Sequence, residues 1–311
     1  MKDLQVIEQI SGAVSKETAD LILASVSKNT LRMYRKAVNR IEAWLAGRVL
    51  TDPLLAEYIT ALHIEGKSPG TIGGVVAAVQ WRAKQLGVPS VVGEITTHTL
   101  AGIRREGKGR GRGQVDGLSW SEVDRVCGYC EAEQSIAGLR DASLIRLMSD
   151  CLLRVSEAVA VNVEDFHKHT LTVRHSKTDQ EGEGASQFVC DATIDLIERY
   201  REVGQIAEGA LFRRMFKGDR LSVYRLSDRS ARQIIKDRAS AIGIKGFISG
   251  HSLRVGSAES LAQGGASIVE MQVAGRWKDS NMPAHYARSL LAQRGAVARL
   301  RNGGTAEKSE S

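Results

Sequence analysis

Four side chains with complementary chemistry lie between residues 251 and 286 of this sequence. His251 and Arg254 are three residues apart at the start of a predicted helix, so both leave the same face. Trp277 and Tyr286 follow, nine residues apart. An imidazole transfers protons, a guanidinium binds anionic oxygens, an indole donates a hydrogen bond and a phenol serves as a nucleophile. This combination suits attack on a phosphodiester.

Three predicted helices must hold these groups. The first begins near His251 and is expected to end at the glycine pair 264–265. A short helix from about 267 to 274 follows and is expected to stop at the next glycine. Pro283 is expected to open the last helix, which carries Tyr286.

A second charged pair lies upstream, in an apolar segment. Arg154 and Glu157 are three residues apart among leucine, valine and alanine residues. A cation and an anion in such surroundings need partners. They are expected either to pair with each other or to serve a functional site. Lys177 follows in a polar connection between two predicted strands, near 171–173 and 188, where a lysine is ordinarily solvated.

The order of these residues resembles the tyrosine recombinase (phage integrase) family. The resemblance rests on His-x-x-Arg, then Gly-x-Trp, then Tyr, and on the upstream Arg with Glu three residues later. Trp277, where many members have a second histidine, is most similar to the pattern of Cre recombinase and its relatives. The resemblance implies a catalytic set of seven residues: Arg154, Glu157, Lys177, His251, Arg254, Trp277 and Tyr286.

The resemblance also implies how the strand is cut. Tyr286 is expected to attack the phosphodiester and form a 3′-phosphotyrosine, with His251 accepting or relaying its proton. Lys177 is expected to protonate the leaving 5′-oxygen. The phosphotyrosine conserves the bond energy for rejoining, so no ATP, metal or other cofactor is expected. The sequence contains no Walker motif and no cluster of Asp and Glu that would bind a metal.

The remaining members of the set are expected to act through charge. Arg154, Arg254 and Trp277 are expected to donate to the pentavalent transition state more strongly than to the ground state. Glu157 is expected to orient His251 or Arg154 rather than to react.

Length and charge fit a DNA-binding protein of two domains. The chain has 311 residues, 42 % of them hydrophobic, and a formal net charge of +7 with a pI near 9.3. This balance favours a polyanionic partner, although an ordinary soluble basic protein has the same character. No apolar run is long enough to span a membrane, and the N-terminus lacks a signal-peptide core. The expected location is the cytoplasm, in association with the nucleoid.

Residues 1–105 are predicted to form a helical core-binding domain that contacts DNA. Its clearest helix spans 28–46, where apolar residues repeat at helical spacing: Leu31, Tyr34, Val38, Ile41 and Leu45. Another face of this helix carries cations without acidic partners one turn away, which suits phosphate contact as well as simple solvation. The candidate DNA contacts on it are Arg32, Arg35, Lys36 and Arg40.

Three further helices are predicted in this domain, at 52–66, 68–87 and 97–105. The second of them contains Gly70, Gly73 and Gly74, which permit close approach by another helix or by a DNA backbone. Helix packing is the expected reason. The resemblance implies instead that this helix lies in the major groove, with candidate contacts at Thr71, Gln80, Arg82 and Lys84.

Residues 106–116 are predicted to link the two domains. Glycine alternates there with Lys108, Arg110 and Arg112, which disfavours a helix and predicts a flexible cationic segment. The segment is a plain linker, or, if the two domains grip opposite sides of a duplex, its charges match phosphates.

Residues 117–301 are predicted to form an α+β catalytic domain. A capping box at 119–122 opens it, and helices are expected near 136–151, 191–203 and 227–242, with a small antiparallel sheet between the first two. The expected fold class of the whole chain is therefore mainly α.

The end of the chain has a second apolar stripe. Leu290, Val297 and Leu300 share one helical face, which either folds back on its own domain or, as the resemblance implies, docks into a neighbouring protomer as a C-terminal exchange helix. The expected partners are double-stranded DNA with inverted-repeat arms and copies of this chain, two on one site and four in the synapse. Residues 302–311 are small and polar and are expected to be disordered.

Three functions remain open at this point. Site-specific recombination is the leading hypothesis. A type IB topoisomerase-like or hairpin-forming strand transferase uses the same chemistry without a synapse of four protomers. A non-catalytic DNA-binding protein with this fold is disfavoured, because Tyr286, Arg154 and Arg254 are all present.

Overall fold

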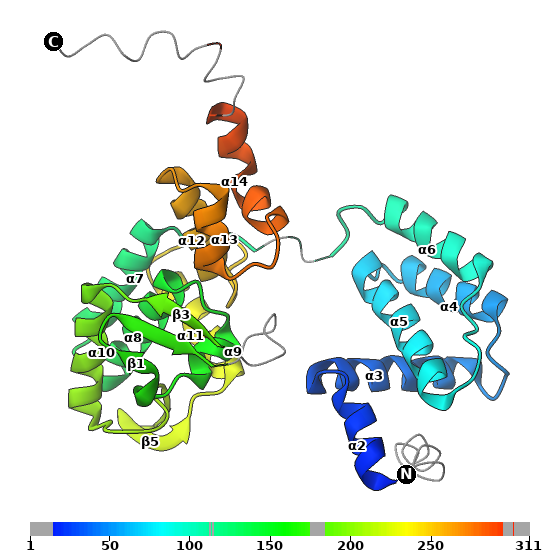
Figure 1. Ribbon diagram of the computed structural model, residues 1–311, viewed down its shortest axis with the longest axis horizontal. Coiled ribbons are helices and arrows are strands. Elements are labelled where there is room, and N and C mark those ends of the chain that lie inside the picture. The colour runs from blue at the N-terminus through cyan, green and yellow to red at the C-terminus, as the bar shows by residue number, and fades with distance from the viewer. Residues whose placement is uncertain (1–14, 112, 114, 175–183, 295–300, 302–311) are drawn as a thin grey trace. The chain divides into compact units, whose positions relative to one another are not determined.

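The chain folds into two compact units. The computed structural model describes residues 15–111, 113, 115–174, 184–294 and 301. One unit spans Met1–Gly113 and the other Gln114–Ser311, so the division falls within the segment 106–116. Helices make up the first unit, and helices with short antiparallel strands make up the second (Figure 1). The predicted fold class is confirmed.

Side-chain caps begin the helices of the first unit. Ser27, Thr51 and Ser68 each accept a hydrogen bond from a backbone N–H in the first turn of the following helix. The helices of this unit are α2 (Lys16–Ala24), α3 (Lys28–Leu45), α4 (Asp52–Ile64), α5 (Pro69–Leu86) and α6 (Glu94–Glu106).

Helix α6 begins at Glu94 rather than near 97, because Asp52 of α4 binds its free N–H groups. Asp52 Oδ1 accepts hydrogen bonds from the backbone N–H of Gly93 (2.9 Å) and Thr96 (3.0 Å), and Oδ2 accepts from that of Ile95 (3.0 Å). Hydrogen bonding, with the Thr96 side chain as the largest cause, lowers the pKa of Asp52. A contact distant in sequence thus sets this helix start.

The core of the first unit follows the predicted apolar spacing of α3. Val38, Ile41 and Leu45 are buried in one cluster with residues of α4, α5 and α6. Trp44 closes its edge, with its ring centroid 5.2 Å from that of Tyr58. These contacts leave the cationic face of α3 exposed.

The glycines of α5 do not have the packing role that was expected for them. An added Cβ at Gly70 or Gly73 would meet no other described atom within 4 Å. One at Gly74 would make only ordinary contact, with Met33 at 3.8 Å. Since glycine weakens a helix by about 1 kcal/mol relative to alanine, packing within this unit does not explain these residues.

The second unit combines helices with two small antiparallel sheets. One has the order β1-β2-β3, and its β2–β3 pairing, with Thr170 opposite Phe188, is the sheet that the sequence predicts. The other is a β4–β5 hairpin that the sequence analysis did not predict. The elements are α7 (Trp120–Ala132), α8 (Ile136–Asp150), α9 (Val155–Ala160), η1 (Val163–Asp165), β1 (Phe166–His167), β2 (Thr170–Val173), β3 (Ala185–Phe188), α10 (Asp191–Gly204), β4 (Arg213–Phe216), β5 (Arg220–Arg225), α11 (Asp228–Ala241), α12 (Ser252–Gln263), α13 (Ile268–Gly275) and α14 (Asn281–Arg294). Among the described helices, none has the length and apolarity to cross a membrane.

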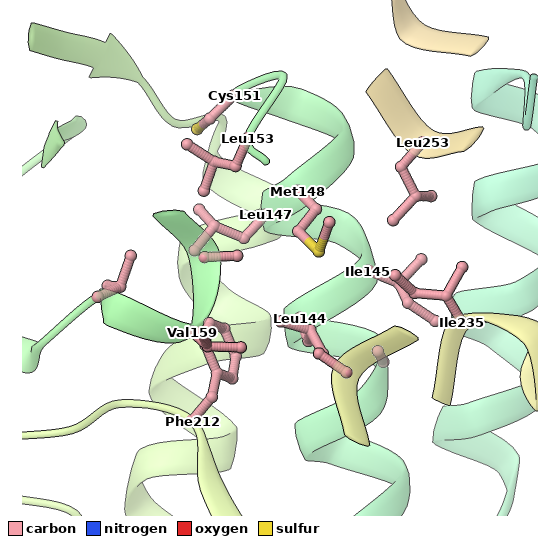
Figure 2. Packing of buried hydrophobic residues seen from close by; sticks show 14 of the residues in the cluster. Leu144, Ile145, Leu147, Met148, Cys151, Leu153, Val159, Phe212, Ile235 and Leu253 are labelled. Carbon is pink, nitrogen blue, oxygen red and sulfur yellow. The ribbon is translucent and has the colours of Figure 1, made fainter. Parts of the chain in front are cut away.

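Helix α8 lies at the centre of the second unit. Figure 2 shows its Leu144 and Met148 among buried side chains from several other elements, including Leu253 of α12. Burial of each such side chain contributes about 1.5–3 kcal/mol. Because Leu253 directly precedes Arg254, this packing fixes the beginning of α12.

Two further contacts hold α12 in place. Gly256 lies against the segment before α7, where an added Cβ would be 1.9 Å from the Leu118 carbonyl oxygen, so a larger residue does not fit. Ser257 Oγ lies 2.9 Å from Ser149 Oγ of α8. The helix that carries Arg254 is therefore anchored on two sides.

Candidate active site

Tyr286 and His251, two of the predicted catalytic residues, lie next to each other in the second unit. Tyr286 Oη lies 3.5 Å from His251 Nε2. Tyr286 is only 7 % exposed, and burial raises the pKa of its phenol. The phenol therefore keeps its proton at neutral pH, and attack requires a base within reach.

The helix that carries Tyr286, α14, begins at Asn281, so the prediction that Pro283 opens it is wrong. Pro283 is tolerated there because the N–H groups of the first turn have no intrahelical partner.

His251 has the properties of that base. It is the N-cap residue of α12, where its side chain stays partly accessible. Partial burial lowers its pKa from the ordinary 6.5, and the positive charges of Arg254 and Arg154 lower it further. His251 is therefore neutral at pH 7 and accepts a proton.

Arg254 is buried beneath this pair and is 1 % exposed. Its Nη1 and Nη2 donate to the carbonyl oxygens of Leu152, just after α8, and Gly275, at the end of α13. Burial, followed by the charges of Arg154 and Arg276, lowers its pKa to about 10, so it remains a cation at neutral pH. Arg254 thus joins the three segments that form the site.

The face of the Trp277 ring covers Arg254. The guanidinium carbon lies 4.7 Å from the indole centroid, and the Tyr286 ring centroid lies 5.7 Å from the same indole centroid. A Cβ at Gly275 would overlap this indole, which explains the glycine that ends α13. The cation–π contact is a role that the sequence analysis did not assign. Donation by the indole N–H to a substrate stays a prediction.

Arg154 and Glu157 are paired, and a third residue joins them. Arg154 Nη1 lies 2.6 Å from Glu157 Oε1, and the Arg154 backbone N–H donates to Oε2 at 3.0 Å. Arg276 Nη2 lies 2.6 Å from the same Oε2. Sequence reasoning missed Arg276, although a cation between Gly275 and Trp277 was a signal for it. It takes the left-handed C-cap position of α13, which was expected to be filled by glycine.

Some predicted residues lie outside the described ones. These are Lys177, Arg112, and Val297 and Leu300 of the predicted C-terminal stripe. For Leu290 the structure gives the backbone, within α14. The assignments of these residues stay predictions.

Four of the candidate DNA contacts of the first unit line one groove. Helix α3 contributes Arg32, Lys36 and Arg40, and α5 contributes Thr71. Two of the open glycine positions, Gly70 and Gly74, line the same groove. The other candidates Arg35, Gln80, Lys84 and Lys108 are exposed. Positive charge and accessible backbone thus occur together between α3 and α5.

Two candidate cations of this unit already have partners. Arg82 of α5 forms an ion pair with Glu42 of α3. Arg110 Nη1 donates to the backbone carbonyl of His63 at 3.0 Å, at the end of α4. These contacts give both residues a role within the unit, and their contact with DNA stays a prediction.

Comparisons with known proteins agree with the predicted resemblance. The family model described as the phage integrase family matches residues 118–292, more than half of the chain. Recombinase Cre of Escherichia phage P1 is 24 % identical over 266 residues, which cover 78 % of this chain and 78 % of Cre. An integrase/recombinase XerD homolog of Selenomonas ruminantium is 26 % identical over 283 residues, covering 84 % of this chain and 82 % of the relative.

Solved structures share the fold. The XerH site-specific recombinase in a post-cleavage complex with palindromic difH substrate gives a TM-score of 0.67 at 15 % identity, covering 88 % of this chain and 80 % of the XerH chain. A lambda integrase dimer bound to a COC′ core site gives a TM-score of 0.61 at 16 % identity, covering 87 % of this chain and 75 % of that chain. Together with the family match, they confirm the predicted resemblance to tyrosine recombinases.

Proposed function

This chain belongs to the phage integrase family, and we propose that it is a site-specific DNA recombinase that cuts and rejoins strands through Tyr286. In the proposed step, Tyr286 Oη attacks the scissile phosphorus and the bond to the 5′-oxygen breaks. The product is a 3′-phosphotyrosine and a free 5′-hydroxyl. Attack by a 5′-hydroxyl reverses the step and rejoins a strand, so neither ATP nor a metal is required.

The contact between Tyr286 and His251 is the observation that carries this proposal. The two residues are 35 positions apart, yet the phenol oxygen and the imidazole nitrogen lie within 3.5 Å. Burial raises the pKa of the phenol and lowers that of the imidazole, so Tyr286 needs a base and His251 is in its basic form. His251 takes the phenolic proton as the bond to phosphorus forms.

Arg254 and Arg154 stabilise the charge that develops on the phosphate oxygens. A guanidinium has five N–H donors, so the two carbonyl contacts of Arg254 leave others for an oxyanion. The face of the Trp277 ring packs against the Arg254 guanidinium and holds it in place. Lys177 protonates the departing 5′-oxygen, as its match to the family pattern implies.

The partners of this reaction are DNA and further copies of the chain. The groove between α3 and α5, with Arg32, Lys36 and Arg40, suits a DNA backbone. XerH was solved on a palindromic site and lambda integrase as a dimer on a core site. By analogy, two protomers bind inverted-repeat arms of one site, and four form the synapse through the C-terminal helix.

Trapping the covalent adduct tests this function. A target site is first selected from random duplexes, and a nicked version of it is then incubated with the protein in EDTA. The expected product is an adduct on the peptide that contains Tyr286, with none from Tyr286→Phe, which should bind the same site normally. An adduct on another residue, or cleavage only with added metal, would contradict the mechanism. Strand exchange between two duplexes separates recombination from cleavage and resealing alone.

A further inference from the structure

Arg276 occupies a backbone position that does not favour arginine. It is the C-cap of α13 with φ 52° and ψ 45°, the left-handed region in which glycine and asparagine are usual. A glycine would make this turn with less strain. The reason for an arginine must therefore lie in its side chain.

That side chain enters the active site. It is 8 % exposed, its Nη2 lies 2.6 Å from Glu157 Oε2, and its Nη1 donates to the Cys151 carbonyl oxygen at 3.3 Å. Its Nε–H is buried and has no acceptor within the described part of the chain. Burying a guanidinium with an unmatched donor destabilises a fold, so this arrangement is not explained by stability alone.

Glu157 is shared between two guanidinium groups. Its carboxylate is 2 % exposed, with Oε1 on Arg154 and Oε2 on Arg276. In a simple pair with Arg154, the carboxylate would cancel the positive charge that Arg154 presents to a phosphate. Arg276 supplies a second positive charge to the same carboxylate, so the cluster keeps a net positive charge.

We propose that Arg276 is a positioning residue for strand cleavage, which balances the charge of Glu157 so that Arg154 remains available to the scissile phosphate. The inference rests on the proposed function, because it concerns the same phosphate. It assigns a role to a residue outside the predicted catalytic set. Arg276 acts through Glu157 and Arg154 and does not itself need to touch DNA.

The test uses two substrates that differ in charge. One selected site carries an ordinary scissile phosphate, and the other carries a methylphosphonate, which is neutral and needs less compensating charge during attack. Arg276→Gly removes the guanidinium and leaves a residue suited to the left-handed backbone. The matched control is Gln205→Gly, because Gln205 is the C-cap of α10 with nearly the same conformation, φ 50° and ψ 48°. Thermal melting checks that every variant is folded.

Arg276→Gly should slow single-turnover cleavage of the phosphate by about 10- to 100-fold, the usual effect of losing a group that orients the reacting ones. Cleavage of the methylphosphonate should slow much less, and DNA affinity should not change. Arg276→Lys, which restores a cation, should recover part of the rate. Combining Arg276→Gly with Glu157→Gln should also recover rate, because the unbalanced carboxylate is then gone. Gln205→Gly should behave as wild type.

Three results would overturn the inference, and they can be told apart. Equal slowing on both substrates, with no recovery from Glu157→Gln or Arg276→Lys, would mean that the Arg276 side chain only holds the local structure through its contacts with Cys151 and Glu157. Failure of the wild-type protein to form a Tyr286 adduct on either substrate would overturn the proposed function, and this inference with it. A normal wild-type adduct with full activity of Arg276→Gly would overturn the inference alone.

Discussion

The arginines of the α3–α5 groove and those of the candidate active site occur in opposite environments. On α3 of the first unit, Arg32 and Arg40 are exposed beside a groove. In the second unit, Arg254 and Arg276 are almost fully buried, and their N–H groups contact backbone carbonyls or the Glu157 carboxylate. The same kind of side chain is solvated at the groove and held in a fixed geometry at the candidate active site.

This difference in burial determines what the exposed arginines of α3 and the buried arginines of the candidate active site contribute to function. An exposed guanidinium tolerates small changes of geometry, and salt screens its attraction for phosphates. A buried guanidinium has lost its hydration and is stable only where its donors meet acceptors, so its direction is fixed before substrate arrives. We therefore expect changes on α3 to alter DNA affinity, and changes among the buried arginines to alter the cleavage rate at nearly constant affinity.

Arg254→Lys should give the largest effect in this comparison. A lysine keeps the charge but cannot donate to the Leu152 and Gly275 carbonyls and also cover the Trp277 ring, because its ammonium lacks the planar fork. Single-turnover cleavage should fall by about 10²- to 10³-fold, the usual effect of losing a fixed oxyanion donor. DNA affinity, measured by filter binding, should stay near that of the wild type.

Arg238→Lys is the control for loss of an ion-paired, partly buried arginine. Arg238 forms ion pairs with Glu133 and Asp141 in the same unit and contributes nothing to the candidate site. Its variant should melt at a lower temperature, while the folded fraction cleaves normally. Equal rate losses in both variants would mean that Arg254 acts by stabilising the fold and not through the orientation of its guanidinium.

The fold was predictable where the physical cause is local. The spacing of Val38, Ile41 and Leu45 on α3, and the capping box of Ser119 and Glu122 on α7, depend on residues within a few turns. The Arg154–Glu157 pair is also local, since a helix brings residues three apart together. The order of the site residues pointed to the family for the same reason: each motif is short.

Contacts between distant segments were not predictable from spacing. The start of α6 depends on Asp52, and the side chain of Arg276 pairs with Glu157, far upstream. In both cases a side chain of one element binds a backbone N–H group or a charged side chain of another element. The β4–β5 hairpin was missed because its strands are short and rich in arginine, and β5 has exposed positions on both faces.

The next largest effect should be the pH dependence of cleavage, which depends on a histidine of the second unit. Burial and neighbouring arginines lower the pKa of His251 below 6.5, and burial raises the pKa of Tyr286. His251 is therefore the base above its lowered pKa, so the rate at pH 6.5 should exceed half of its maximum and should fall about tenfold per unit at pH values below that pKa. Single-turnover cleavage rates of preformed complexes, measured between about pH 5 and 8, where histidine ordinarily titrates, test this pH dependence.

Two histidine variants complete the pH experiment. His251→Gln should be slow at every pH and lack the acid limb. His98→Gln, which changes an exposed histidine of α6 in the first unit, should keep both the rate and the limb. Because the unfolded state binds the His251 proton more tightly, acid also lowers stability, so circular dichroism must show a folded protein at the lowest pH used. An acid limb that persists in His251→Gln would assign the titration to another group.

The smallest effect is expected from the exposed arginines, and it should appear in the salt dependence. Each phosphate contact contributes about −0.9 to the slope of log K against log salt, so the double variant Arg32→Gln and Arg40→Gln should flatten the slope by about 1.8. The control, Arg104→Gln with Arg105→Gln on α6, has the same change in net charge but lies outside the α3–α5 groove, and should keep the slope. Complexes of either variant, once formed at low salt, should cleave at the wild-type rate, because all the candidate catalytic residues of the second unit are unchanged. If the α3 variant instead slows the bound complex, its arginines contribute to positioning as well, and the division of labour between exposed and buried arginines fails. If both variants flatten the slope equally, the first unit attracts DNA by net charge alone, and the groove has no special role.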